Sequence, residues 1–267
     1  MSSFVLYGGP GAGKTTMAAS FCKLGKRVHI LDMDRKVRGM YHLQQFLDSG
    51  LLTTWEPKSA LIADSMSLRA KNWKQGLTLQ PKGYLEFAEE LDRIGKIKEP
   101  EWDVLVLDSI TRVNEHLRRM IMHVQGRPGI FLDDYGIILN NFEELFTYFF
   151  ALPFEHTILI AHDRSDQDAV TGKFETRPLI DGQARDKVGS FVSEMYYLQP
   201  KGKADDMAYM ALTKPDGRFY ARTSMPIEMW VEADFEVIYA MVDQAKKGKT
   251  NGGKEEPKRS PLPRKAS

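Results

Sequence analysis

A glycine-rich run that carries one lysine and one threonine lies near the start of the chain. It reads Gly8-Gly-Pro-Gly-Ala-Gly-Lys-Thr15 and fits the spacing G-x-x-x-x-G-K-S/T. Glycines let the backbone wrap closely around an anion and turn several N–H groups toward it, and a helix that begins there adds a favourable dipole. We therefore expect an ATP site in which Lys14 reaches the β- and γ-phosphates and the Thr15 hydroxyl binds Mg²⁺. The residues expected around the nucleotide are Gly8, Gly9, Pro10, Gly11, Ala12, Gly13, Lys14, Thr15 and Thr16.

A carboxylate at the end of a later apolar run suits the same site. Trp102–Leu107 is predicted as a buried strand because it ends in the continuous apolar run Val104–Leu107, and Asp108 follows it directly. A carboxylate at such a strand end is placed to hold the Mg²⁺ of a bound nucleotide. We expect this role for Asp108. The alternative is a structural one, in which Asp108 and Ser109 cap the helix that follows.

Two further carboxylates follow the apolar run Val28–Leu31. Side chains alternate along a strand, so Asp32 and Asp34 point the same way. Ligands of open α/β sheets gather at the carboxyl ends of the strands, where a general base for the attacking water would have to lie. Asp34 is the preferred base. The alternative is a carboxylate that only supports the fold or caps a helix.

Helical and strand patterns alternate along the chain in the order that these residues require. This alternation predicts an α/β fold with a mainly parallel sheet flanked by helices. Ala208–Thr213 and Arg218–Arg222 flank Lys214-Pro-Asp-Gly217 and predict a late antiparallel hairpin. Residues 163–182 lose periodicity and predict a long polar loop, and residues 55–82 look like an inserted element. The strands expected are Ser3–Tyr7, Val28–Leu31, Trp102–Leu107, Thr157–Ala161 and Glu194–Leu198, and the helices are Lys14–Leu24, Tyr84–Ile97, Ile110–Val124, Asp134–Phe150 and Gln183–Ser190.

The composition predicts one domain over residues 1–245 and a basic tail over 246–267. The tail carries eight Lys and Arg residues against two Glu residues, although the whole chain has a formal net charge of only +1. It has almost no apolar residues, so we expect it to be disordered. It either attracts nucleic acid through phosphate neutralisation or only aids solubility. No apolar run is long enough to span a membrane, no signal peptide is apparent, and Cys22 is the single cysteine, so we expect a cytoplasmic protein.

The order of these motifs resembles the RecA-like branch of P-loop ATPases, and most closely the core-only phage proteins of the Sak type, which act in recombination and single-strand annealing. The segments that carry the resemblance are the P-loop, Asp32-Met-Asp34, Val104–Ser109 and Ile158–Asp163 followed by Gly182–Val188, within a match over residues 3–240. The resemblance implies a RecA-like core and Mg²⁺-dependent ATP hydrolysis. The family usually has glutamate where this chain has Asp34, which implies slow turnover. His162 matches the residue that senses the γ-phosphate, unless it is only a structural histidine.

The same resemblance implies contacts with single-stranded DNA. Residues 164–182 correspond to a mobile DNA-contacting loop, and 125–135 correspond to a second one; the alternative is a solvated loop with scattered charge. Lys214 lies where related proteins place a basic residue that reaches a neighbouring subunit's γ-phosphate. Other implied partners are further copies of the chain, in a ring or filament that the sequence does not require, and a single-strand DNA-binding protein. The residues expected at DNA are Arg127, Arg164, Lys173 and Arg177 on phosphates and Phe174 stacked on a base.

Two other functions remain open at this point. The run Gly8–Lys14 also resembles the phosphate loop of small-molecule (nucleotide) kinases such as adenylate kinase, with residues 163–182 as an arginine-bearing lid. An aspartate at position 34, where the family usually has glutamate, suits a nucleotide-dependent switch or a replication and helicase accessory factor that hydrolyses little ATP. The late hairpin and the basic tail favour the RecA-like interpretation over the kinase.

Overall fold

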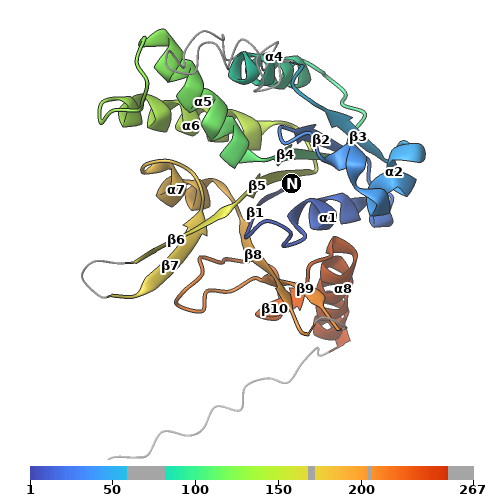
Figure 1. Cartoon of the computed structure of the whole chain (residues 1–267). Coiled ribbons are helices and arrows are strands. Elements are labelled where there is room, and N and C mark those ends of the chain that lie inside the picture. The colour runs from blue at the N-terminus through green and yellow to red at the C-terminus, as the bar shows by residue number, and fades with distance from the viewer. Residues whose placement is uncertain (59–81, 168–171, 204–205, 252–267) are drawn as a thin grey trace, which may run out of the picture.

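The protein is built around one twisted sheet of eight strands. The computed structural model describes residues 1–58, 82–167, 172–203 and 206–251 (Figure 1). The sheet has the order β10-β9-β8-β1-β5-β4-β2-β3, with β1, β2, β3, β4, β5 and β8 parallel and with β9 antiparallel to both of its neighbours. The strands are β1 (Ser2–Tyr7), β2 (Val28–Asp32), β3 (Leu52–Trp55), β4 (Val104–Asp108), β5 (His156–Ala161), β8 (Glu194–Lys201), β9 (Ala208–Leu212) and β10 (Trp230–Glu232).

Helices cover both faces of this sheet (Figure 1). The helices α4, α5 and α6 pack with α7 on one face, and α1 packs with α8 on the other. The α-helices are α1 (Lys14–Ala19), α2 (Gln44–Asp48), α4 (Gly83–Gly95), α5 (Ile110–Val124), α6 (Asp134–Ala151), α7 (Ala184–Lys187) and α8 (Phe235–Asn251). Short 3-10 turns are η1 (Ser20–Leu24), η2 (Val37–Gly39), η3 (Tyr41–Leu43) and η4 (Val188–Phe191).

The central strands read as apolar runs because both of their faces are covered. In β1, Val5 and Tyr7 join the core under α5 and α6, whereas Phe4 and Leu6 join the core under α1 and α8. Every residue of β2, β4 and β5 is buried. This burial on two sides is typical of parallel sheets. The predicted fold class, a mainly parallel sheet with flanking helices and late antiparallel strands, is confirmed.

The prediction of a long polar loop over residues 163–182 is wrong. β6 (Asp163–Gln167) and β7 (Phe174–Pro178) pair antiparallel as a separate two-stranded sheet. Most of its side chains are polar, and of its strand residues only Thr176 and Pro178 are buried, so the sequence has no apolar alternation to reveal the strands. Figure 1 shows this hairpin projecting from the body of the molecule. Residues 168–171, between the two strands, lie outside the described residues.

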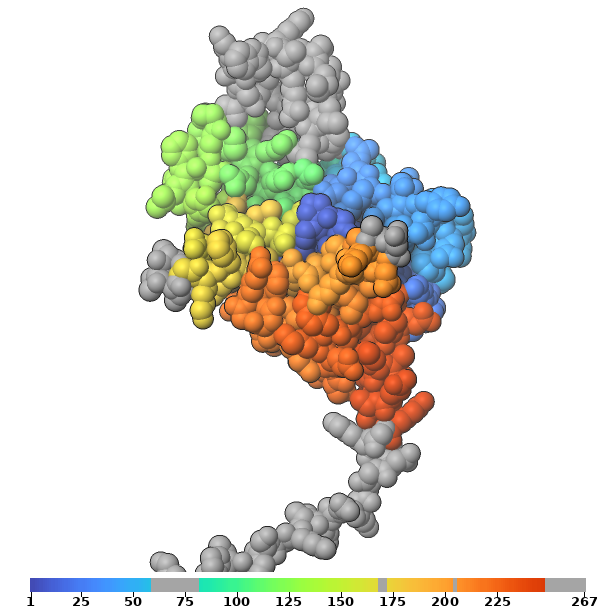
Figure 2. Space-filling view, turned by 60° about the horizontal axis from the view of Figure 1, so that its bottom comes forward, coloured from blue at the N-terminus to red at the C-terminus, as the bar shows by residue number. Residues whose placement is uncertain are grey.

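The predicted antiparallel pairing of Ala208–Thr213 with Arg218–Arg222 is wrong. β9 forms, but it pairs with β8 and β10, while Arg218–Arg222 makes only single bridges, from Phe219 to Thr176 and from Arg222 to Met195. The Asp216 carboxylate accepts the backbone N–H groups of Arg218 and Phe219, both at 2.9 Å. This local turn directs the chain toward β7 and away from β9. Figure 2 shows the hairpin (yellow) beside this later part of the chain (orange).

Helix α8 ends at Asn251, beyond the domain end predicted at residue 245, so the first residues of the predicted disordered tail are helical. Residues 252–267 lie outside the described residues, as does nearly all of the predicted inserted element at 55–82. Of that element, β3 includes Trp55, and it extends the sheet next to β2.

Candidate nucleotide site

The glycine-rich run forms a tight loop between β1 and α1. Gly8, Gly11 and Gly13 all have φ in the left-handed region, and Gly13 is the N-cap of α1. A side chain on Gly8 would collide with the carbonyl oxygen of Leu198 in β8, so this position requires a glycine. The loop is therefore packed closely on the sheet, with its N–H groups near the start of the helix. This cradle fits a phosphate group.

Lys14 lies in the concavity of this loop. Its ammonium group donates hydrogen bonds to the carbonyl oxygens of Gly8 and Gly9, both at 2.7 Å. Burial lowers the pKa of Lys14 to about 8, against the attraction of Asp108. The side chain thus holds a cation in a low-dielectric loop without a carboxylate in direct contact. Such a cation is suited to anionic phosphate oxygens.

The two residues assigned to Mg²⁺ are in direct contact. The Thr15 hydroxyl donates a hydrogen bond to Asp108 Oδ2 at 2.5 Å, and both side chains are buried. The peptide bond after Asp108 is cis. No group of three or more His, Cys, Asp or Glu residues in the described part of the chain could hold a metal ion by itself. A hydroxyl and a carboxylate are hard oxygen donors, and Mg²⁺ is commonly held by one or two such groups together with phosphate oxygens and water. The residues present therefore fit Mg²⁺ bound with a nucleotide.

Asp32 is the last residue of β2 and Asp34 lies in the turn that follows, and the two carboxylates have different partners. Asp32 is fully buried, and its Oδ2 accepts the backbone N–H groups of Lys36 and Val37 at 2.8 and 2.7 Å. Burial raises its pKa to about 6, although these hydrogen bonds oppose the shift. Asp32 thus fixes the turn, and Asp34 is the carboxylate that faces the site.

Asp34 is held between two cations that the sequence analysis missed. Its Oδ2 lies 3.4 Å from the Lys36 ammonium, and its Oδ1 accepts a hydrogen bond from Arg112 Nε at 2.9 Å. Ser109 donates to the same carboxylate at 3.2 Å. Burial alone would raise the pKa of Asp34, but Lys36 and Arg112 outweigh it and hold the pKa below its usual value. The sequence does show a basic residue shortly after each strand-end carboxylate, Lys36 after Asp34 and Arg112 after Asp108, and this spacing could have predicted the two cations.

His162 lies directly after β5, which is inserted between β1 and β4. The strand order therefore brings the residue between the P-loop and Asp108. Burial, reinforced by the charge of Lys14, lowers the pKa of His162 and so favours the neutral imidazole. Its Nδ1 is buried and has no hydrogen-bond partner among the described residues. Buried polar atoms of this kind call for a ligand or water, which supports the predicted sensor position.

The model of one protein family matches residues 2–225, which is most of the chain; the family is described as an AAA domain. The chain belongs to the AAA-domain family. This membership, the P-loop and the sheet order confirm the prediction of a RecA-like P-loop ATPase at the level of the family. Among curated proteins, none matches the chain in sequence.

Three solved structures resemble this AAA-domain chain at low identity. The flagellar accessory protein FlaH from Methanocaldococcus jannaschii is 13% identical, with a TM-score of 0.42 over 86% of this chain and 83% of its own. A KaiC-like protein from Pyrococcus horikoshii OT3 is 13% identical, with a TM-score of 0.40 over 79% and 77%. The RadB recombinase is 13% identical, with a TM-score of 0.44 over 79% and 87%.

The residues expected at DNA lie mostly on the hairpin β6–β7 of the AAA-domain chain. Phe174 is 55% exposed, and Lys173 is also exposed. Arg164 pairs with Asp166 at 2.8 Å. Arg177 pairs with Glu175 and Asp186. The arginines are therefore at the surface but already bound to carboxylates of the same chain.

Arg127 lies in the connection between α5 and α6. Its guanidinium contacts the fully buried carboxylate of Asp134 and stacks over the ring of Phe131, 4.5 Å from its centroid. Phe131 and Leu132 are themselves exposed, which leaves an apolar surface beside Arg127. Arg127 thus holds this connection in place in addition to any contact with a ligand.

Lys214 is exposed in the turn after β9, and Thr16, the last of the predicted nucleotide residues, contacts His42 Nε2 at 2.8 Å. None of the described helices is long and apolar enough to cross a membrane.

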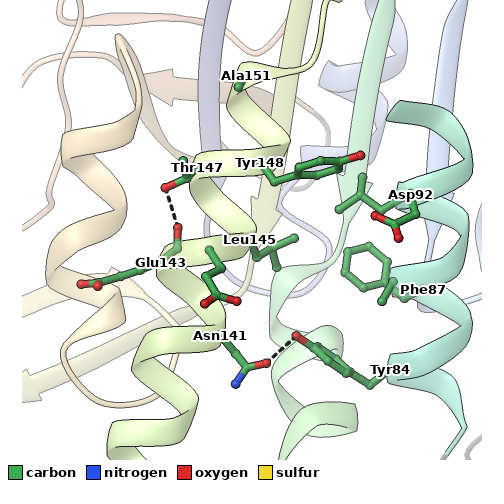
Figure 3. Close-up of a pocket in the computed structure, with 12 residues that line it drawn as sticks. Tyr84, Phe87, Asp92, Asn141, Glu143, Leu145, Thr147, Tyr148 and Ala151 are labelled. Carbon is green, nitrogen blue, oxygen red and sulfur yellow. Dashed lines mark hydrogen bonds between the residues drawn. The ribbon is translucent and has the colours of Figure 1, made fainter. Parts of the chain in front are cut away.

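An open groove of about 680 Å³ lies between α4 and α6, away from the P-loop (Figure 3). Phe87 of α4 and Tyr148 of α6 are among the residues that line it, and none of its lining residues belongs to the nucleotide site.

Proposed function

We propose that this chain is an Mg²⁺-dependent ATPase of the RecA-like type that binds single-stranded DNA and promotes recombination or single-strand annealing. From its resemblance to the phage Sak-type proteins, we expect the chain to act in the cytoplasm of a bacterial host. Copies of the chain and a single-strand DNA-binding protein are its further expected partners. The nucleotide half of the proposal rests on the P-loop, and the DNA half rests on how the hairpin β6–β7 is attached to that site.

The chemistry of the nucleotide half follows from the residues around the loop. The backbone N–H groups of the loop and Lys14 would bind the phosphates, while Thr15 and Asp108 would hold the Mg²⁺ ion. Mg²⁺ supplies charge neutralisation on the phosphate oxygens. Asp34 accepts the proton of the attacking water, but its lowered pKa makes it a weak base, so turnover is slow.

The observation that carries the DNA half is a set of hydrogen bonds between His162 and the end of the hairpin. The His162 N–H donates to Thr111 Oγ1 at 3.0 Å, and the Thr111 hydroxyl donates to the Leu179 carbonyl at 3.1 Å. The Leu179 N–H donates back to the His162 carbonyl at 2.7 Å. Leu179 directly follows β7. A shift of His162 toward a γ-phosphate would therefore move the base of the hairpin.

The exposed surface of the hairpin suits a single strand better than a duplex. Phe174 offers an aromatic face, and bases stack on such faces without regard to sequence. Arg164 and Arg177 must exchange their carboxylate partners for phosphates, so we expect moderate affinity that falls steeply with salt. Lys214 would complete the ATP site of a neighbouring copy, which makes oligomerisation dependent on ATP.

The test is binding of ATP and of a fluorescent oligonucleotide by the wild type and by Lys14→Ala. A charged hydrogen bond to phosphate is lost in the variant, so ATP affinity should fall by about 10- to 100-fold. Oligonucleotide binding by the wild type should change when ATP and Mg²⁺ are added, and that change should disappear in Lys14→Ala. Lys26→Met, which removes a surface pair with Glu155 at the opposite end of the sheet, is the control and should behave as the wild type.

A nucleotide-dependent switch that hydrolyses little ATP is the second candidate, and the two cations on Asp34 favour it. It predicts tight ATP binding with negligible turnover even when DNA is present. The nucleotide kinase is the third candidate, and it predicts phosphorylation of AMP in a separate assay with ATP and Mg²⁺. No DNA binding at low salt would remove the recombination proposal and leave these two.

A further inference from the structure

The ammonium group of Lys36 lies between two carboxylates of the nucleotide site. It is 3.2 Å from Asp108 Oδ1 and 3.4 Å from Asp34 Oδ2. Asp108 is fully buried. Among the described residues, no other cation pairs directly with Asp108, because Lys14 donates to the P-loop carbonyls and Arg112 pairs with Asp34 and Glu115. Lys36 is thus the counter-ion of the carboxylate assigned to Mg²⁺.

The backbone fixes Lys36 in this place. Its own N–H and that of Val37 both donate to Asp32, and Val37 is fully buried. The preceding residue, Arg35, has φ of 57°, which turns the chain sharply. The Lys36 side chain therefore leaves a rigid turn, but it keeps a flexible stem and is 36% exposed. It can change partners without a change in the fold.

The electrostatics explain why a partner change is expected. A bound Mg²⁺ would take over the neutralisation of Asp108, since a divalent ion is the largest local charge in such a site. The Lys36 ammonium would then lie beside Asp34 with one partner fewer. The γ-phosphate of a triphosphate held by Lys14 would offer it a new anionic partner. A diphosphate lacks this group.

We propose that Lys36 is the internal cation of the carboxylate pair and that it contacts the γ-phosphate when ATP and Mg²⁺ bind. The proposal rests on the nucleotide half of the proposed function and adds a residue that distinguishes a nucleoside triphosphate from a diphosphate. Before a nucleotide binds, Lys36 offsets the negative charge of Asp34 and Asp108. When ATP and Mg²⁺ bind, its contact with the γ-phosphate favours ATP over ADP.

The decisive measurement is the ratio of ATP to ADP affinity, by calorimetry with Mg²⁺, for the wild type and Lys36→Met. Loss of a charge-assisted contact to the γ-phosphate should lower ATP affinity by about tenfold or more, with ADP affinity changed by less than about threefold. Lys36→Arg keeps the charge and should keep most of the ATP preference. Lys26→Met is the matched control, since it also breaks a lysine–carboxylate pair but lies far from the P-loop.

A second readout needs no nucleotide. In EDTA, Lys36→Met leaves Asp34 and Asp108 with one cation fewer, so its melting temperature should fall below that of the wild type and should rise when MgCl₂ is added. A smaller rise is expected for the wild type, because Lys36 competes with the ion.

The outcomes separate this inference from the proposed function. If the wild type binds no ATP, the proposed function itself fails. If the wild type binds ATP but Lys36→Met loses ATP and ADP affinity equally, or neither, the inference is wrong and the proposed function stands. Should Lys36→Met not fold, the ATP to ADP ratios of Lys36→Arg and Lys36→Gln decide: equal ratios overturn the inference, and a ratio lowered only in Lys36→Gln supports it.

Discussion

The hydroxyl of Thr15 and the carboxylate of Asp108 are joined by a hydrogen bond of 2.5 Å, although they are far apart in the chain. The first belongs to the start of α1 and the second to the end of β4. β5 lies between β1 and β4 in the sheet and ends at Ala161, directly before His162. The carboxyl ends of the parallel strands thus bring together the phosphate loop, the two residues proposed for Mg²⁺ and the proposed sensor.

Asp108→Asn should separate nucleotide binding from hydrolysis. The amide keeps an oxygen that can accept from Thr15 but loses the charge that Mg²⁺ requires. ATP hydrolysis should fall by roughly 100-fold or more, whereas ATP binding in EDTA should stay within about threefold of the wild type. Calorimetry with and without Mg²⁺ checks this. Wild-type hydrolysis in the variant would show that Asp108 serves only the fold.

Asp34→Asn should leave ATP binding intact and reduce turnover. A general base contributes about 10²- to 10⁴-fold, and the lowered pKa of Asp34 puts this chain at the lower end. A loss of about 100-fold is therefore expected in a phosphate-release assay. Asp92→Asn, an exposed carboxylate on α4, is the control. Equal turnover in wild type and Asp34→Asn would assign the base to another group.

Thr111→Val should weaken the link between ATP and DNA. The change removes the hydroxyl that joins His162 to Leu179 at nearly constant shape and leaves their backbone groups without that partner, which costs about 1 to 3 kcal/mol of stability. Basal hydrolysis should remain, and its stimulation by single-stranded DNA should fall. Thr147→Val, whose hydroxyl bonds only within α6, is the control. Full stimulation in Thr111→Val would mean that the hairpin is not coupled through this threonine.

Asp32→Asn should change how stability depends on pH. Burial raises the native pKa of Asp32 to about 6. The native state therefore binds the proton more tightly than the unfolded state, and this contribution is present at low pH and lost as pH rises through 6. Asparagine has no charge to bury, so the variant should gain about 2 to 3 kcal/mol relative to the wild type between pH 4 and pH 7. Urea unfolding at both pH values measures this, and a pH-independent difference would contradict it.

The sequence predicted the parts of the site that depend on strand ends. Asp108 and His162 follow strictly apolar runs, and in a parallel sheet the carboxyl ends of such runs meet at one edge. The roles assigned to these residues remain predictions. Lys36 and Arg112 were missed because nothing in local periodicity shows that a turn and a helix start aim two cations at Asp34.

The hairpin β6–β7 and the pairing of β9 could not be read from periodicity either. β6 buries no residue and β7 buries only Thr176 and Pro178, so the alternation of apolar and polar side chains that indicates a strand is absent. At 214–217 the turn residues were recognised correctly as a turn, but the Asp216 side chain sets its direction. β9 pairs with β8, and this contact between separate segments of the chain is not visible in the local sequence around the turn.

The central claim is that a P-loop ATPase site is coupled to a surface for single-stranded DNA. Steady-state ATP hydrolysis, measured at low salt with and without an oligonucleotide and repeated with Asp34→Asn as the background, tests it most directly. We predict slow hydrolysis that single-stranded DNA increases several-fold and that salt suppresses. Hydrolysis that is indifferent to DNA at every salt concentration, or phosphorylation of AMP in its place, would contradict the account.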